Sequence, residues 1–194
     1  MALFAEGEKV VNHKKNKIHP HKFTMWIGIG SIVMMFAGLT SAYIVKRQQP
    51  GWLGFEIPSA FWYSTGMILG SSLTMQLALK AFRERNLRNY RNMLSVTVLL
   101  GIGFIIFQLF GFSTIWKTGV TFNGSGAGQF LYVIAGLHLL HVIGGIIALI
   151  AMNIRAFNRQ VRNYNVTPVE VVATYWHFVD FLWIYLFIFF IIMR

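Results

Sequence analysis

Two ionisable side chains lie in the middle of the last long apolar stretch of the chain. His177 and the chain's only aspartate, Asp180, stand in the segment YWHFVDFLWIYLF. Residues three apart share one face of a helix, so these two side chains point the same way. An ionisable group in hydrocarbon is costly unless it is neutral, paired or turned toward other protein. The pair therefore predicts an inward-facing polar site, for which proton transfer, metal or haem ligation and structural hydrogen bonding are the available chemistries.

Four further polar residues lie in or beside apolar stretches and extend this site into a predicted polar seam. They are Gln108, His138, His141 and Glu170. Counted at about 1.5 Å per residue from the connection between the last two apolar stretches, His141 lies roughly 16 Å deep and Asp180 roughly 14 Å deep. A contact between these two side chains is geometrically allowed if their helices are neighbours. All three membrane histidines, in contrast, cannot converge on one point.

The polar seam is predicted to be structural rather than catalytic. Haem ligation needs two histidines at matched depth on facing helices, and a catalytic zinc needs three converging protein ligands. A proton relay is the second interpretation, because chains of intramembrane Asp and His are its usual parts. Nothing ionisable occupies the other half of the bilayer, so this chain alone offers no complete path. We therefore expect no catalytic residue, no cofactor-binding residue and no metal ligand here.

Five apolar stretches are long enough to position these residues on membrane-spanning helices. A span needs about 20 residues, and the stretches cover residues 23–45, 59–82, 93–116, 130–152 and 171–193. Thr167, Pro168 and Glu170 predict a capping box that starts the last helix. The sequence thus predicts an all-α fold in which one five-helix transmembrane domain, residues 23–194, follows a basic N-terminal tail, residues 1–22.

The distribution of Lys and Arg predicts the orientation in the membrane. Thirteen of the 17 Lys and Arg residues lie in the N-terminal tail and in the second and fourth connections. Because basic residues concentrate on the cytoplasmic side, the N-terminus is expected in the cytoplasm and the C-terminus outside. The same distribution explains the net charge of +11 without a nucleic-acid partner, since the charges lie between apolar stretches and not along one soluble face.

Composition excludes several classes of protein. The chain is 56% hydrophobic and 12% charged, which leaves too little charged surface for a soluble globule of 194 residues. It contains no cysteine, so disulfides, iron–sulfur clusters and thiolate copper sites are excluded. The sequence is that of an integral membrane protein.

Two segments carry a more specific signal. They are YWHFVDFLW, preceded by Glu170, and GLHLLHVIGG in the fourth apolar stretch, with FAGLTSAY and the pair Phe107-Gln108 as weaker matches. These segments resemble the signatures of subunit III of the haem-copper cytochrome c and quinol oxidases. The resemblance covers the chain from Lys22 onward and is to the short, five-helix bacterial form.

The resemblance implies a multi-pass subunit of the bacterial cytoplasmic membrane that carries no haem or copper itself. Such a subunit packs on a terminal oxidase that reduces O2 to water in aerobic respiration. The expected partners are the haem- and copper-bearing catalytic subunit I, a copper-bearing or quinol-type subunit II, and bound phospholipid; an oxidase of this kind can also join a respiratory supercomplex. The family is thought to support assembly, oxygen access and sustained proton uptake of its partner in the electron transport chain.

The resemblance also assigns residues. The positions that match the family's pattern are His138, His141, Glu170, Trp176, His177, Asp180 and Trp183. Candidate lipid-binding residues are Arg155, Trp176, His177 and Trp183. An arginine at a helix end can fork onto a phosphate, although membrane topology explains Arg155 equally well. Ile32 stands where many members have a buried glutamate, so a role resting on that glutamate is not expected here.

Two other functions remain open at this stage. One is the accessory subunit of a nitric oxide reductase, which is related, short and also five-helical. The other is a stand-alone membrane redox or transport protein, in which the ionisable residues of the polar seam would serve transport or electron transfer.

Overall fold

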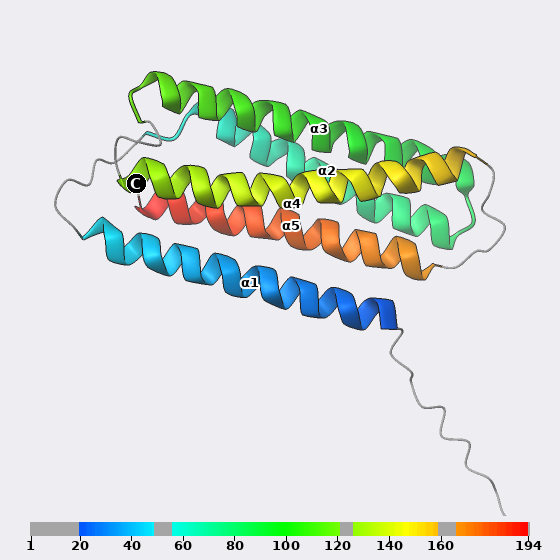
Figure 1. Ribbon diagram of the computed structural model, residues 1–194. Coiled ribbons are helices and arrows are strands. Elements are labelled where there is room, and N and C mark those ends of the chain that lie inside the picture. The colour runs from blue at the N-terminus through cyan, green and yellow to red at the C-terminus, as the bar shows by residue number, and fades with distance from the viewer. Residues whose placement is uncertain (1–19, 49–55, 121–125, 159–165, 194) are drawn as a thin grey trace, which may run out of the picture.

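Five helices connected in up-and-down order form the protein (Figure 1). The computed structural model describes residues 20–48, 56–120, 126–158 and 166–193, and this part of the chain contains no strand. The helices are α1 (Pro20–Arg47), α2 (Ser59–Arg83), α3 (Leu87–Lys117), α4 (Gly126–Phe157) and α5 (Thr167–Met193). The predicted all-α fold is confirmed, and each helix contains the apolar stretch predicted for it. The predicted N-terminal tail lies outside the described residues up to residue 19, and its last three residues belong to α1.

Helices α1, α3, α4 and α5 are long and apolar enough to cross a membrane. Helix α2 is of similar length, 25 residues. Its 25 residues include seven Ser, Thr and Gln side chains, among them two adjacent serines, Ser71 and Ser72. These polar residues lower its hydropathy, and Ser71 and Ser72 bond to side chains of α5.

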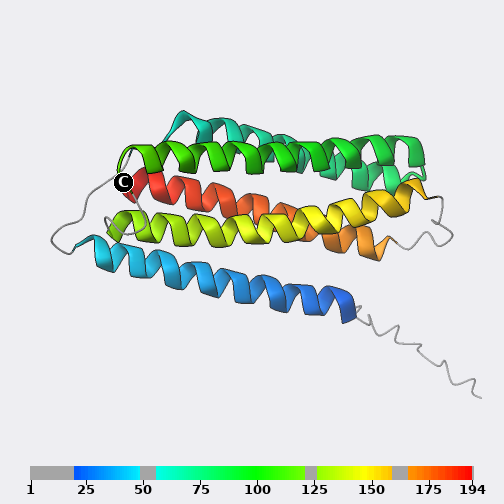
Figure 2. The ribbon, with the colours of Figure 1, turned by 45° about the horizontal axis from the view of Figure 1, so that its top comes forward.

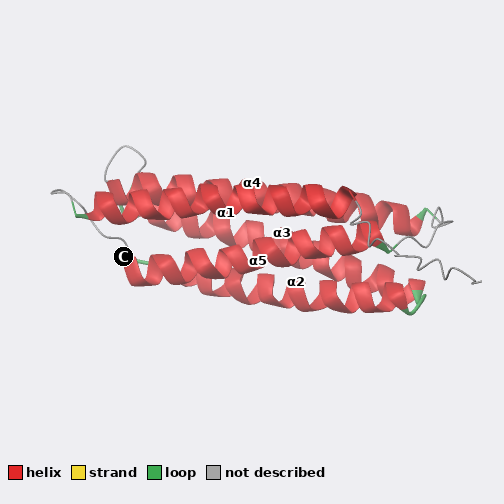
Figure 3. Cartoon of the chain, turned by 90° about the horizontal axis from the view of Figure 1, so that it is seen from below, coloured by secondary structure: helices red, strands yellow, loops and turns green. Residues whose placement is uncertain are grey.

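Four of the helices close a ring, and the fifth lies outside it. Helix α2 packs on α3 and α5, and α4 also packs on α3 and α5, whereas α1 packs only on α4 and α5 (Figures 2 and 3). Because α5 contacts three of the four other helices, its side chains can meet partners on several sides. We call the end of the bundle where α1, α3 and α5 begin the basic end; its described cations include Lys22, Lys80, Arg83, Arg91 and Arg155.

The largest buried side chain of α5 sits between two glycines. Trp176 has no exposed surface. A Cβ added to Gly145 of α4 would lie 3.0 Å from its indole ring, and a Cβ added to Gly101 of α3 would also lie 3.0 Å from it. Small residues let helices approach closely in a membrane, where packing replaces the hydrophobic drive between helices. The Gly101–Trp176–Gly145 contact therefore fixes the spacing of α3, α4 and α5.

This contact predicts that substitutions of two adjacent glycines differ in their effect on stability. Gly145→Leu should lower the free energy of unfolding by roughly 1–3 kcal/mol, because overpacking forces rigid aromatic rings to move. Gly144→Leu is the matched control, since a Cβ at Gly144 meets nothing within 4 Å. Thermal unfolding in one detergent, followed by tryptophan fluorescence, compares the two variants. Equal melting temperatures for both would contradict the role given to the glycine contact.

Candidate functional site

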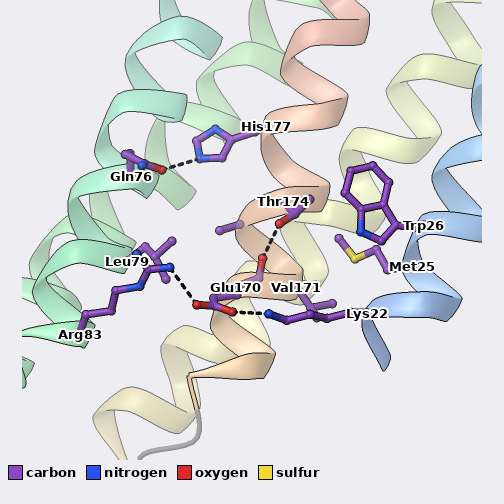
Figure 4. A pocket seen from close by; sticks show the side chains of 11 residues that line it. Lys22, Met25, Trp26, Gln76, Leu79, Arg83, Glu170, Val171, Thr174 and His177 are labelled. Atoms are coloured by element: carbon purple, nitrogen blue, oxygen red, sulfur yellow. Dashed lines mark hydrogen bonds and ion pairs between the residues drawn. The ribbon is translucent and has the colours of Figure 1, made fainter. Parts of the chain in front are cut away.

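A carboxylate at the basic end joins three helices. Glu170 of α5 accepts from Lys22 of α1 at 2.7 Å and from Arg83 of α2 at 2.8 Å (Figure 4). All three side chains are partly exposed, so each ion pair contributes modestly to stability. The sequence predicted a capping box for this residue; in the structure α5 begins at Thr167, and the carboxylate of Glu170 reaches to its neighbours in α1 and α2.

An open pocket of about 460 Å³ lies beside this ion cluster, between α1, α2 and α5. Figure 4 shows Gln76 and His177 next to each other on α2 and α5, farther along these helices than the ion cluster of Lys22, Arg83 and Glu170. The lining residues are Lys22, Met25, Trp26, Gln76, Leu79, Arg83, Glu170, Val171, Ala173, Thr174 and His177. The pocket thus brings charged and polar side chains to one place at the basic end of the bundle.

Helices α2 and α5 share a line of hydrogen bonds that starts in this pocket. His177 Nε2 lies 3.2 Å from Gln76 Oε1, and His177 Nδ1 lies 2.6 Å from Ser72 Oγ. One residue along each helix, the indole N–H of Trp176 donates to Ser71 Oγ at 2.7 Å. We call these five residues the α2–α5 network. It gives His177 and Trp176 polar partners inside a largely apolar bundle.

Asp180 is buried beside the network but has no hydrogen bond of its own. Its side chain is 2% exposed, and neither carboxyl oxygen has a partner of hydrogen-bonding geometry. The Ser72 hydroxyl is close enough to this carboxyl to interact with it, but the two groups do not meet hydrogen-bonding geometry. Since Ser72 also bonds to His177, one hydroxyl stands between the two ionisable side chains. The sequence-predicted pair His177 and Asp180 is therefore brought together through a residue of α2.

The two histidines of α4 lie in different surroundings. His138 is 1% exposed and neither ring nitrogen has a partner. Its ring stacks on Trp183 with centroids 5.3 Å apart, and Phe36 and Phe104 meet it edge-on. His141 Nδ1 lies 2.7 Å from the carbonyl of Leu137 in its own helix. The described residues include no hydrogen bond between His141 and Asp180 and no group of three or more metal-ligating side chains.

Gln108 and Trp183 bond to hydroxyls of α2 at a second level of the bundle. Gln108 Nε2 donates to Ser64 Oγ at 3.4 Å, and its Oε1 has no partner. Trp183 Nε1 donates to Thr65 Oγ1 at 3.0 Å. Sequence reasoning missed these partners in α2. Their spacing is a usable signal, because Ser64-Thr65 and Ser71-Ser72 are seven residues apart and so lie on the same face of a helix.

The candidate lipid-binding residues divide into two groups. Trp176 and Trp183 have essentially no exposed surface, so their rings lie inside the bundle. Arg155 is exposed near the end of α4, and His177 lines the pocket at the basic end. Ile32 packs against the hydrophobic core from α1. Only Arg155 and His177 are placed where a lipid could reach them.

Comparison with known proteins points to one family. The sequence model of the family described as "Cytochrome c oxidase subunit III" matches residues 2–193. A protein of Nocardia farcinica named "Probable cytochrome c oxidase subunit 3" is 32% identical over 169 residues, which is 83% of this chain and 82% of that protein. "Cytochrome c oxidase subunit 3" of Bacillus subtilis is 28% identical over 189 residues, covering 94% and 89% of the two chains.

The ion cluster predicts a salt-dependent attachment of α1. Glu170→Gln should lower the free energy of unfolding by less than about 1 kcal/mol per lost pair, because surface ion pairs are weak. The difference from wild type should shrink as salt is added, since salt screens exposed charges. Thermal unfolding at low and high salt measures this. Glu84→Gln is the control, because Glu84 is exposed and forms no ion pair within the described residues; a salt-independent loss in Glu170→Gln would contradict the prediction.

Proposed function

Because the chain belongs to the cytochrome c oxidase subunit III family, we propose that it supports the assembly and durability of the oxidase's catalytic subunits and contributes no redox centre of its own. The family match over residues 2–193 carries this proposal. Subunit III of a haem-copper oxidase associates with catalytic subunits, and we expect these to be a haem- and copper-bearing subunit I and a copper-bearing or quinol-type subunit II. The oxidase they form reduces O2 to water.

The polar seam is proposed to hold the helices in place. Three helices meet at Glu170, and the side chains of α5 bond to hydroxyls of α2 at two levels. Polar groups that find partners on a neighbouring helix fix its position in a membrane, because hydrocarbon offers no alternative partner. A rigid, multi-helix subunit of this kind can brace the catalytic subunit and keep its proton-uptake and oxygen-entry routes in working order.

We further propose that the basic end faces the cytoplasm. Most cations of the described residues lie at this end, and the cations at the opposite end are Lys46, Arg47 and Lys117. Such an asymmetry is typical of cytoplasmic loops and helix ends. The pocket beside Glu170 then opens toward the cytoplasmic leaflet.

Phospholipid is the ligand proposed for the outer surface of α1 and α5. An apolar groove of about 310 Å³ lies between them, lined by Val33, Phe36, Ala37, Phe178, Phe181, Leu182 and Tyr185. Its lining suits an acyl chain, and cations at the basic end, with Arg155 among them, suit a phosphate head group. Trp176 and Trp183 are left out of this proposal because they are buried.

Purification through a tag on this chain tests the proposed partnership. In mild detergent, a haem-bearing and a copper-bearing subunit should co-purify, and the sample should give a reduced-minus-oxidised haem spectrum. Co-purification with a nitric oxide reductase would replace the proposal by that alternative. If the chain emerges alone, without haem, the proposed association is wrong; a Soret band from the isolated polypeptide would favour a stand-alone redox protein.

Asp180→Asn separates a supporting role from a catalytic one. The variant should lower the yield of assembled oxidase, or its working lifetime, more than the initial turnover per haem. The reason is that a buried amide with unmatched N–H donors costs about 1–3 kcal/mol. Oxygen consumption normalised to haem gives both the initial rate and its decay, and Glu84→Gln is the acid-to-amide control. An equal loss of turnover in a fully assembled, haem-replete complex would contradict this supporting role.

A further inference from the structure

We propose that Asp180 is a proton-binding carboxyl that exchanges its proton with the pocket at the basic end through Ser72 and His177. Three observations converge on this site. The carboxyl is buried without a hydrogen bond, Ser72 faces it, and Ser72 in turn bonds to His177, whose other nitrogen meets Gln76 at the pocket. Figure 4 shows one part of this line, the contact of His177 with Gln76, among the side chains that line the pocket.

The direction of each hydrogen bond follows from the outermost partner. Gln76 Oε1 can only accept, so His177 carries its proton on Nε2 and donates it to Gln76. The Nδ1 atom of a neutral imidazole is then an acceptor, and Ser72 donates its hydroxyl proton to it. The lone pairs of Ser72 Oγ are left to accept from a protonated Asp180. Every donor in this line therefore points from the buried carboxyl toward the pocket.

The same atoms also accommodate the state with one proton fewer. When His177 releases its Nε2 proton to water in the pocket, Ser72 passes its hydroxyl proton to Nδ1 and takes the proton of Asp180. The products are an Asp180 carboxylate, an intact Ser72 hydroxyl that now donates to it, a neutral His177 with its proton on Nδ1, and one hydronium ion. Turning the Gln76 amide over then presents an N–H to the vacated Nε2. Reversal of these steps reloads the carboxyl, and no group other than water is consumed.

In its resting form Asp180 is protonated, because the charged side chains near it pair with one another and not with its carboxyl. The other charged side chains that line this pocket, Lys22 of α1, Arg83 of α2 and Glu170 of α5, pair with one another at its mouth. On the α4 side, His141 bonds to its own helix and His138 is enclosed by aromatic rings. No cation among the described residues forms an ion pair with Asp180. A carboxylate supported by one hydroxyl is costly in hydrocarbon, so the carboxyl holds its proton until His177 relays it.

The site is reached from one end only. Within the described part of the chain, no hydrogen bond leads from Asp180 onward to His138 or Gln108. A line of polar groups that ends at a carboxyl stores a proton and does not conduct it across the membrane. The proposal rests on the proposed function in one respect: the proposed orientation, in which the basic end faces the cytoplasm, sets the side of the membrane that supplies the proton.

One property of the sequence makes the test direct: Asp180 is the only aspartate. Cell-free synthesis of the full chain with aspartate labelled with ¹³C at the side-chain carboxyl, in lipid nanodiscs, places the label at this residue alone. Infrared spectra in H2O should contain the labelled carbonyl band of a protonated carboxylic acid. On transfer to D2O the band should already be shifted in the first spectrum, because the proton exchanges through the relay.

Three variants decide whether the relay carries the exchange. In Ser72→Ala and in His177→Phe the labelled band should remain, but its immediate shift in D2O should be lost. Ser71→Ala is the matched control, since its hydroxyl bonds to Trp176 and lies outside the relay; it should shift as wild type does. Circular dichroism confirms that each variant keeps its helices. Because no oxidase partner is present, the result does not depend on whether the proposed partnership is right.

Three outcomes would overturn the proposal. A labelled band of an ionised carboxylate in wild type at every pH would show that Asp180 does not hold a proton. A protonated band that fails to shift in D2O would show a sealed site. An immediate shift in both Ser72→Ala and His177→Phe would show that protons reach Asp180 by another route.

Discussion

The need to give every polar group inside the membrane a partner within the protein determines much of this bundle. Hydrocarbon supplies no hydrogen bonds, so a helix with interior indole, imidazole and carboxyl groups must lie against a helix that offers hydroxyls. Helix α5 carries the first kind of side chain and α2 carries the second, and they meet at two levels, Trp176 with Ser71 and Trp183 with Thr65. The lower hydropathy of α2 thus follows from the hydroxyl side chains with which it bonds to α5. Helices α3 and α4 contribute small residues instead, and their Gly101 and Gly145 admit the indole of Trp176.

Helix α1, which lies outside the four-helix ring, also finds partners for its polar side chains within the protein, but through fewer contacts. Helix α1 is tied to α5 at both ends: Lys22 pairs with Glu170, and the Tyr43 hydroxyl donates to the carbonyl of Met193 at 3.3 Å. Between these ties Thr40 and Tyr185 share a hydrogen bond of 3.1 Å, beside the apolar groove that we assign to an acyl chain. A helix attached at intervals leaves room along its length for lipid, whereas the four-helix ring leaves none at the level of Trp176. The ring therefore provides rigidity, and the α1–α5 edge provides a surface that lipid can fill.

The sequence predicted the helices well because membrane thickness fixes their length and apolar composition marks them. It also predicted that His177 and Asp180 share one face of a helix, since spacing along a helix determines which residues share a side. It did not predict the partners, because depth is readable from residue counts but the rotation of one helix against another is not. His141 and Asp180 lie at similar depth, yet Asp180 faces Ser72 of α2 while His141 bonds to its own backbone. Glu170 fitted a capping pattern, and its carboxylate accepts from two cations on α1 and α2 that the sequence did not indicate as partners.

Two buried groups without hydrogen bonds, His138 and Asp180, differ in what surrounds them, and the difference bears on their roles. Aromatic rings enclose His138, whose flat imidazole stacks on Trp183 as another ring would. Packing accounts for that residue without any exchange with water. Asp180 instead lies close to the Ser72 hydroxyl, which bonds to His177 at the edge of a pocket. A network that served structure alone would gain nothing from an opening at one end, because water competes for the hydrogen bonds that fix the helices. The contact of His177 with Gln76 at the pocket is therefore the feature that a purely structural explanation leaves unexplained and that proton exchange at Asp180 accounts for.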